Sequence, residues 1–321
     1  MTSGLRHYME RFAHLRTDKS MQRWTENTKF RAPHKPLLLL TVLSQIEGGS
    51  LKTNRIYPSP ELALDFRQQW ARVLEPSPSA SFVLPFFHLR SEGFWHLVAV
   101  PGKQDQLHTA RTLSGASQLH ELVDYATLDS ELFALAQSAT DRAALVAVLV
   151  ETYFVGDAQS AIREQVYISA QAAIYSEQLL NHITTLGTNL QPNVRSQGFR
   201  RAVIRAYERS CAFCGIRLIT PDWRVVVDAA HIIPWSHSQN DDPCNGIALC
   251  KLCHWTFDAG FLCISDDFCL HGSPQLRVTP NLPEQVIRLT NRRIIGPRDE
   301  SLWPSQSSLA WHRDNKFMRS A

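Results

Sequence analysis

Residues 211–261 read CAFCGIRLITPDWRVVVDAAHIIPWSHSQNDDPCNGIALCKLCHWTFDAGF, and this stretch decides the fold of the C-terminal part of the chain. Two Cys-x-x-Cys pairs lie near its ends, Cys211 with Cys214 and Cys250 with Cys253. Each pair offers two thiolates, and Zn²⁺ prefers four nitrogen or sulfur ligands in a tetrahedron. We therefore expect a structural zinc site that stabilises a small unit, because such a unit buries too little apolar surface to fold alone.

Histidine and carboxylate side chains lie between and just after these pairs. Phosphodiester hydrolysis needs a general base that ionises near neutral pH, as unperturbed histidine does, and His231 is the candidate. His254 and Asp258 are four residues apart, so on a helix they share one face and can chelate one divalent cation, Mg²⁺ or Mn²⁺. Asp228 lies three residues before His231 and is a further candidate ligand of that ion. The alternative is a structural zinc ribbon whose histidines are incidental.

In this order His231, Asn245 and His254 match the His-Asn-His pattern of the HNH nucleases, and the segment resembles the zinc-bound HNH (ββα-metal) endonuclease domain. The resemblance implies two strands followed by a helix. It also implies that His231 is the base that activates water, that Asn245 orients that base, and that His254 binds the ion at the scissile phosphate. Many members place Asp or His directly before the base, where this chain has Ala230, so we expect Asp228 to replace that ligand.

Composition narrows the class of protein without naming a function. The 321 residues are 44% hydrophobic and 20% charged, with a net charge of +3, which is ordinary for a globular protein. This balance permits nucleic-acid binding but does not argue for it. We find no apolar run long enough for a membrane span and no signal peptide. Four of the seven cysteines form the metal-type pairs, which favours a reducing, cytoplasmic location.

The hydrophobic pattern predicts an α+β protein. We expect N-terminal helices over residues 3–16, from Pro36 to Gly48-Gly49, and over 60–74, then a hairpin over 81–100 with its turn at Gly93. Helical segments follow over 113–154 and 158–185, with a linker at 185–197. An arginine-rich helix at 197–211 leads into the first cysteine pair. A hairpin around Asn291 and a closing helix over 307–317 end the chain.

The N-terminal half contains no nucleotide-binding loop or metal cluster, and the residues alone give only a mixed α/β domain. Its strings RAPHKPLLLLTVL, LPFFHLRSEGFWHL and VETYF nevertheless resemble the sulfur-binding domain of phosphorothioate-dependent HNH restriction endonucleases, a type IV family. The similarity continues in the same order through QGFRRAV, DAAHIIPW and LCHWTFD. It implies a sulfur-binding-type DNA reader at 1–170, a helix and linker at 171–196, and an HNH domain at 197–321.

Sulfur is larger, softer and less strongly hydrated than oxygen, so an apolar surface favours it over a phosphate oxygen, which would lose water there without adequate hydrogen bonds. The resemblance directs attention to eight residues of the reader. Candidates for the apolar surface are Pro85, Phe86 and Tyr153, and candidates for holding phosphate and base edges are Arg31, His34, Lys35, His88 and Arg90.

The resemblance implies an endonuclease that binds phosphorothioate-modified double-stranded DNA and hydrolyses the backbone nearby. One HNH site cuts one strand, so we expect a homodimer or two successive nicks. Two alternatives stay open: an HNH nuclease that reads another mark, such as a modified cytosine, and a zinc-stabilised DNA-binding protein without catalysis.

Overall fold

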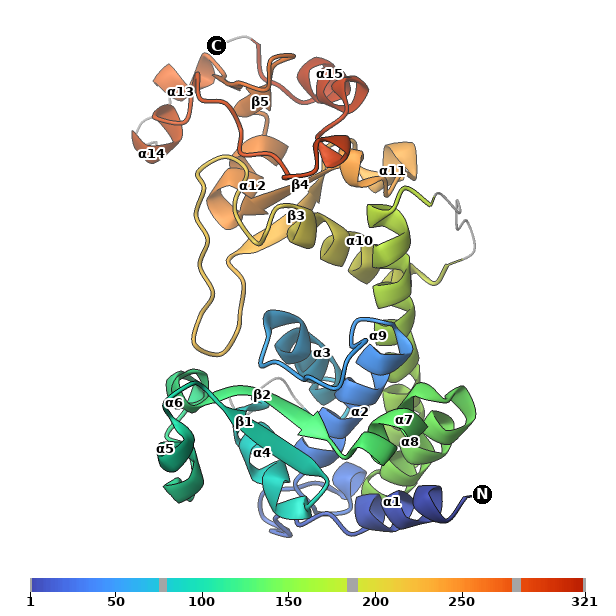
Figure 1. Cartoon of the computed structure of the whole chain (residues 1–321). Helices are drawn as coiled ribbons and strands as arrows, with labels where there is room; N and C mark the ends of the chain where they lie inside the picture. The colour runs from blue at the N-terminus through green and yellow to red at the C-terminus, as the bar shows by residue number, and fades with distance from the viewer. Residues whose placement is uncertain (1, 75–79, 184–189, 279–283, 320–321) are drawn as a thin grey trace. The chain divides into compact units, whose positions relative to one another are not determined.

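The computed structural model describes residues 2–74, 80–183, 190–278 and 284–319 (Figure 1). The chain forms two compact units. Unit 1 contains Met1–Ala173 and Thr220–Arg224, and unit 2 contains Ile174–Ile219 and Val225–Ala321. Part of the expected linker, residues 184–189, lies outside the described residues.

Unit 1 is mostly helical with one two-stranded antiparallel sheet. Its elements are α1 (Ser3–Ala13), η1 (Glu26–Thr28), α2 (His34–Glu47), α3 (Pro60–Trp70), α4 (Val83–His88), η2 (Leu89–Glu92), β1 (Trp95–Ala99), α5 (Gln104–Thr109), α6 (Ala116–Leu122), β2 (Val123–Leu128), α7 (Ser130–Gln137), α8 (Ala139–Tyr153) and most of α9 (Gly156–Leu180).

The core of unit 1 forms around α2. Every residue from Lys35 to Ile46 is buried, as expected for a helix that is apolar on all sides, and α2 packs against α3, α4, α7 and α8. Pro36 lies in its first turn, where the missing N–H costs nothing, and Gly48 caps its end. Ser59 caps α3 by accepting a hydrogen bond from Leu62 N. The helices predicted from the sequence in this region are confirmed.

Two expectations for unit 1 are wrong. Residues 81–100 do not form a hairpin, because Val83–His88 is helical and β1 pairs instead with β2, in the register Trp95↔Leu128. Residues 113–154 are not helical throughout, since β2 interrupts them. The apolar run of α4 is short and buried on its inner side, and such runs do not distinguish helix from strand by their pattern.

Unit 2 contains the ββα arrangement predicted from the cysteine and histidine pattern. β3 (Val227–His231) pairs antiparallel with β4 (Gly246–Cys250), and α12 (Lys251–Asp258) follows β4 directly. The remaining elements are α10 (Pro192–Ala206), α11 (Trp235–Ser238), η3 (Pro243–Asn245), β5 (Leu262–Ile264), β6 (Leu270–Gly272), α13 (Gln275–Val278), α14 (Glu284–Ile287), η4 (Glu300–Leu302) and α15 (Gln306–Asn315).

The core of unit 2 joins α10 to this motif through Phe199, Val203, Val227, Ile247 and Phe257, all buried. The closing helix is confirmed as α15, which Ser305 caps through Ser308 N. The expected hairpin around Asn291 is wrong. Asn291 has φ of 63°, and residues near it form an isolated bridge from Cys269 to Arg293 rather than two paired strands.

Within the described residues, no single helix is long and apolar enough to cross a membrane. α7 and α8 reach that length and composition only when taken together, and they are bent by 105° at the break between them.

Candidate active site and DNA-binding site

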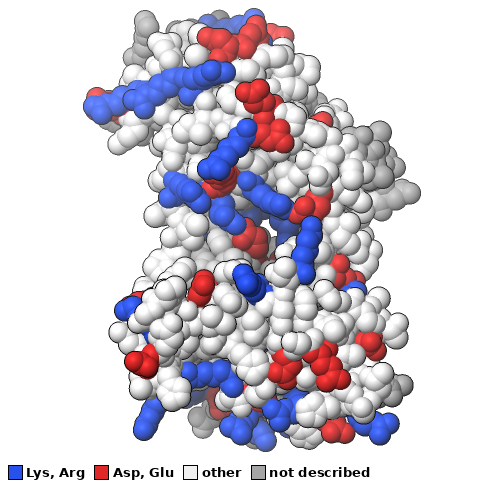
Figure 2. Space-filling view, in the orientation of Figure 1, with Lys and Arg blue, Asp and Glu red and all other residues white. Residues whose placement is uncertain are grey.

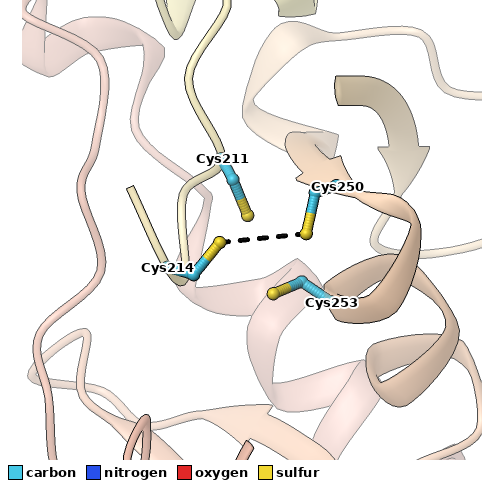
Figure 3. Close-up of side chains that lie close together, drawn as sticks. All are labelled: Cys211, Cys214, Cys250 and Cys253. Atoms are coloured by element: carbon cyan, nitrogen blue, oxygen red, sulfur yellow. Dashed lines mark hydrogen bonds between the residues drawn. The ribbon is translucent and has the colours of Figure 1, made fainter. Parts of the chain in front are cut away.

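The four predicted zinc ligands come together in unit 2. The Sγ atoms of Cys211, Cys214, Cys250 and Cys253 all lie within 4.8 Å of one another, and Figure 3 shows the four side chains pointing toward a common centre. In the part of the chain that the structure describes, they form the one group of three or more metal-ligating side chains this close together. Four convergent sulfurs fit a tetrahedral zinc site.

The cysteine cluster joins two parts of the HNH motif. Cys250 is the last residue of β4 and precedes the first residue of α12, and Cys253 lies in the first turn of that helix. The other two ligands come from the turn that follows α10. A metal ion at this position would therefore fix where α12 begins, and with it the direction of the histidine that follows Cys253.

A cavity of about 410 Å³ beside this helix is lined by two of the three predicted catalytic residues, His231 and His254. Its lining includes His231 from β3 and both His254 and Asp258 from α12, together with Trp235, His312 and Lys316. His231 and two of the three expected ion ligands therefore face one space, although His254 lies 23 positions after His231 in the sequence.

The His231 ring is held on two sides. Its Nε2 lies 2.9 Å from Oδ1 of Asp241, and its face stacks on Phe199 with ring centroids 3.7 Å apart and planes 7° apart. Gly246, the strand partner of His231, makes this stacking possible: a Cβ there would lie 2.9 Å from Phe199 Cζ and 2.5 Å from Val203 Cγ2. The glycine of the Asn-Gly pair is thus required by the close approach of α10.

Asn245 hydrogen-bonds to the backbone beyond His231, and its expected role in orienting that residue stays a prediction. The buried side chain accepts a hydrogen bond from Ile233 N at 2.9 Å and donates to the carbonyl oxygens of Ile233 and Asn240 at 3.0 and 3.1 Å. It fixes the turn that ends β3. The side chain that hydrogen-bonds to the ring is Asp241, which the sequence analysis missed, because nothing distinguishes it from a solvated Asp in the polar loop that it shares with Asp242.

His254 and Asp258 share one face of α12, as predicted from their spacing. His254 Nε2 lies 3.3 Å from Asp258 Oδ2, and this hydrogen bond is the main cause that raises the pKa of His254, against the effect of its burial. One imidazole and one carboxylate suit a divalent cation that takes its remaining ligands from phosphate and water.

Asp228 has other partners. Its Oδ1 accepts a hydrogen bond from Arg200 Nε at 2.7 Å, and its Oδ2 lies 3.6 Å from Lys251 Nζ. Among the described residues, Asp228, His254 and Asp258 do not form a group with ligand atoms within 4.8 Å of one another. The role of Asp228 as an ion ligand therefore stays a prediction, and it requires these two ion pairs to open.

His312 is a lining residue that the sequence analysis did not identify. It is 2% exposed and its ring stacks on Phe257 at 3.8 Å. Its Nε2 lies 3.1 Å from the Phe257 carbonyl oxygen and must donate to it, since a carbonyl accepts only. Burial lowers the pKa of His312 to about 4, so the ring is neutral at pH 7.

In unit 1 the structure brings the predicted DNA-binding strings together at the start of α2. Lys35 forms an ion pair with Glu92 of η2, and both side chains are about nine-tenths buried. Burial, followed by the charges of Lys35 and Arg90, lowers the pKa of His88. The His34 ring lies between those of Trp24 and Trp70, at 5.3 and 4.7 Å.

Two of the side chains predicted to contact DNA, Arg90 and Lys35, already have partners within the protein. Arg90 donates to the carbonyl oxygens of Leu107 and Ala110, and its guanidinium lies 3.9 Å above the Phe87 ring. With Lys35 paired to Glu92, the geometry gives both cations a role in holding unit 1 together. Their contact with DNA stays a prediction.

Arg31 differs from these two cations because it lines a cavity of about 600 Å³ in unit 1, together with Lys19, Lys29 and His14. Its guanidinium lies 5.9 Å from the Tyr153 ring centre. The Tyr153 hydroxyl is buried, donates to Phe12 O at 2.9 Å and accepts from Leu15 N at 2.8 Å, and burial raises its pKa to about 12. Lys19 and Lys29 are cations of this cavity that the sequence analysis missed.

The predicted apolar surface has little exposed area in this conformation. Phe86 is 0% exposed and packs edge-to-face against Trp95, Pro85 is buried, and Tyr153 is 1% exposed. Leu84, directly before Pro85, is by contrast 47% exposed. The side chain that α4 presents to solvent is therefore Leu84, which the sequence analysis did not single out.

On the face of the molecule shown in Figure 2, charge alone does not mark a DNA-binding surface. On the face that Figure 2 shows, Lys and Arg side chains lie interspersed with Asp and Glu, in keeping with the net charge of +3. Basic character is local, as in the cavity at Arg31.

Comparison with known proteins matches both units. The family model described as a ScoMcrA-like DNA sulfur-binding domain matches residues 6–171, more than half of the chain, and the model described as an HNH endonuclease matches residues 211–265. No curated protein matches. A solved structure titled modification dependent TagI restriction endonuclease is 24% identical, over 40% of this chain and 39% of that chain. Its TM-score of 0.29 is too low to relate the two folds.

Proposed function

This chain belongs to the ScoMcrA-like DNA sulfur-binding domain family and contains an HNH endonuclease domain, and we propose from that premise that it cleaves DNA in response to a phosphorothioate in the backbone. The chain thus combines a domain that binds DNA with a domain that cuts it, the organisation of a modification-dependent endonuclease. The observation that carries the proposal is the common cavity of His231, His254 and Asp258 in a chain that also has the sulfur-binding domain.

In the nuclease domain His231 takes a proton from the attacking water. Phe199 and Asp241 hold the ring in one orientation. The ring therefore loses little further conformational entropy when it accepts the proton from water. Trp235 and Ile232 line the same cavity and limit access of other solvent.

His254 and Asp258 fit a divalent cation, because an imidazole and a carboxylate face the cavity together. When bound, Mg²⁺ or Mn²⁺ supplies positive charge to the scissile phosphate oxygens. The four cysteines fit a separate structural zinc ion.

In the reader, Arg31, Lys19 and Lys29 would neutralise backbone phosphates around their common cavity. Leu84 offers apolar surface on which sulfur is favoured over oxygen, because a phosphate oxygen loses more hydration there. Phe86 and Tyr153 are buried and would support the reader surface without contacting DNA. Phe86 would do so by packing, and Tyr153 by its hydrogen bonds to the backbone of Phe12 and Leu15.

We propose that the substrate is double-stranded DNA and that the protein acts in the cytoplasm. A single HNH site cuts one strand, so cleavage of both strands calls for a homodimer or two successive nicks.

A nicking assay tests the proposal with four duplexes: one for each of the two phosphorothioate diastereomers, one all-oxygen and one with modified cytosine. We expect Mg²⁺- or Mn²⁺-dependent nicking of one diastereomer, and none by His231→Ala. His237→Ala, on the exposed part of α11, is the matched control and should nick normally. Equal nicking of all duplexes would remove the sulfur dependence, preference for modified cytosine would favour a different mark, and DNA binding without nicking would indicate a non-catalytic protein.

A further inference from the structure

Asp241 is a buried carboxylate at the centre of a polar network in unit 2. It is 4% exposed and accepts hydrogen bonds on both oxygens. Oδ1 lies 2.9 Å from His231 Nε2 and 2.8 Å from Arg195 Nη1. Oδ2 lies 3.0 Å from the same arginine nitrogen and 3.3 Å from the Tyr175 hydroxyl. A buried carboxylate with this many donors is held in one orientation.

The partners of Asp241 hold it in place. Arg195 supplies the counter-charge that a buried carboxylate needs, and its guanidinium lies 3.7 Å from the Trp235 ring centre. Burial, followed by the charge of Asp241, raises the pKa of Tyr175, so its phenol keeps its proton and can donate. Both residues lie outside the segment that matches the HNH family model, residues 211–265.

The hydrogen bond to Asp241 decides which nitrogen of His231 is available. An ionised carboxylate only accepts, so the hydrogen between the two groups belongs to His231 Nε2. In the neutral imidazole the other nitrogen, Nδ1, then carries a free lone pair. Asn245 cannot decide this, because its side chain bonds to the backbone of Ile233 and Asn240 and not to the ring.

We propose that Asp241, held by Arg195 and Tyr175, is the positioning residue that makes Nδ1 of His231 the proton acceptor. This inference rests on the proposed nuclease function. An O–H bond of the attacking water breaks and its proton passes to Nδ1, while the oxygen forms the new P–O bond. The opposite P–O bond breaks, and the leaving oxygen keeps the electron pair and takes a proton from solvent. Asp241 stabilises the imidazolium that results and does not itself take the proton.

The first measurement is made on the wild-type network, and a variant is used only to assign the signals. In ¹⁵N-histidine-labelled full-length protein, the ring signals of His231 are assigned by their absence in His231→Ala. We expect a protonated Nε2 and a bare Nδ1 in the neutral ring. The opposite tautomer, with Nδ1 protonated, would overturn the inference even if the protein is a nuclease.

The second measurement compares variants under single turnover with saturating DNA. Asp241→Asn keeps the shape but removes the charge, and we expect nicking to slow by roughly a hundredfold or more with DNA affinity unchanged. Asp241→Leu should also lose the single tautomer in the NMR spectrum, because no acceptor faces Nε2. Tyr175→Phe removes only a hydroxyl and should slow nicking a few-fold.

Asp242→Asn is the matched control, since Asp242 lies in the same loop and only caps Cys244 N at 2.8 Å. It should nick at the wild-type rate. Wild-type rates for Asp241→Asn, with His231→Ala inactive, would reject the role of Asp241 and leave the nuclease proposal standing. Normal nicking by His231→Ala would instead reject the nuclease assignment itself.

Discussion

Replacing Lys35 with Met tests whether this predicted DNA contact is a structural residue. Lys35 is 8% exposed and Glu92 is 7% exposed. The ammonium group of Lys35 and the carboxylate of Glu92 form an ion pair inside unit 1. Methionine keeps most of the side-chain length but removes the positive charge. The buried carboxylate of Glu92 then keeps its hydrogen bond from Arg16 N, at 3.2 Å, but has lost its ion pair. An unpaired buried carboxylate is strongly unfavourable.

Breaking a buried ion pair by removing one partner costs about 3–5 kcal/mol, and we expect the lower end because the Arg16 bond remains. For a unit of this size, about 3 kcal/mol lowers the melting temperature by roughly 6–12 °C. The double variant Lys35→Met/Glu92→Leu removes both charges and should recover most of that loss. Thermal unfolding of the full chain, followed by circular dichroism, measures all three proteins.

DNA binding then separates a structural role from a phosphate contact. The two variants compared are Lys35→Met and Arg31→Gln, at a temperature where both are folded. The salt dependence of DNA binding should be the same in Lys35→Met as in the wild type. In Arg31→Gln its slope should fall by about 0.9, the value for one phosphate contact. The structural interpretation fails if Lys35→Met melts like wild type, or if it lowers the salt slope as Arg31→Gln does.

Three further outcomes follow from the site in unit 2. Cys253→Ser should reduce bound zinc to well below one per chain and lower the melting temperature, measured by elemental analysis and calorimetry; full zinc content would exclude Cys253 as a ligand. Asp258→Asn should weaken Mn²⁺ binding about tenfold or more by electron paramagnetic resonance, and unchanged binding would remove Asp258 from the ion site. Burial lowers the pKa of His312 from 6.5 to about 4, so the folded protein resists protonation of this ring while the unfolded chain accepts the proton. The contribution of His312 to the free energy of unfolding is therefore complete above pH 6.5 and is lost as the pH falls toward 4. Over that window His312→Gln should lose stability less steeply than wild type, by about 1.4 kcal/mol per pH unit, and parallel slopes in urea unfolding would contradict the shift.

The sequence was sufficient for the ββα motif because its signals are local. The resemblance to HNH nucleases implied the strands and the helix, and on that helix the spacing of His254 and Asp258 predicts that both side chains share one face. The signals for α2 are also local. Pro36 in its first turn, a long apolar run and the glycines at its end together predict a helix.

The errors arose where distant segments decide the outcome. The strand partner of Trp95 is Leu128, 33 residues along the chain, and the aromatic run before it is helical because it packs against α2. Asp241 and His312 join the candidate active site only through tertiary structure, since neither belongs to a motif. Phe86 and Tyr153 looked suitable for a binding surface by type, but packing placed them inside.

The location of Cys250 and Cys253 at the junction of β4 and α12 affects how chelation experiments on this protein are interpreted. EDTA would remove a weakly held cation from the proposed catalytic site at once, and added Mg²⁺ would restore it. Slower extraction of the thiolate-bound metal would release the first turn of α12, so His254 would lose its direction and added Mg²⁺ alone would no longer restore activity. Inactivation by a chelator should therefore have two phases, and the time of exposure determines which metal the experiment has removed.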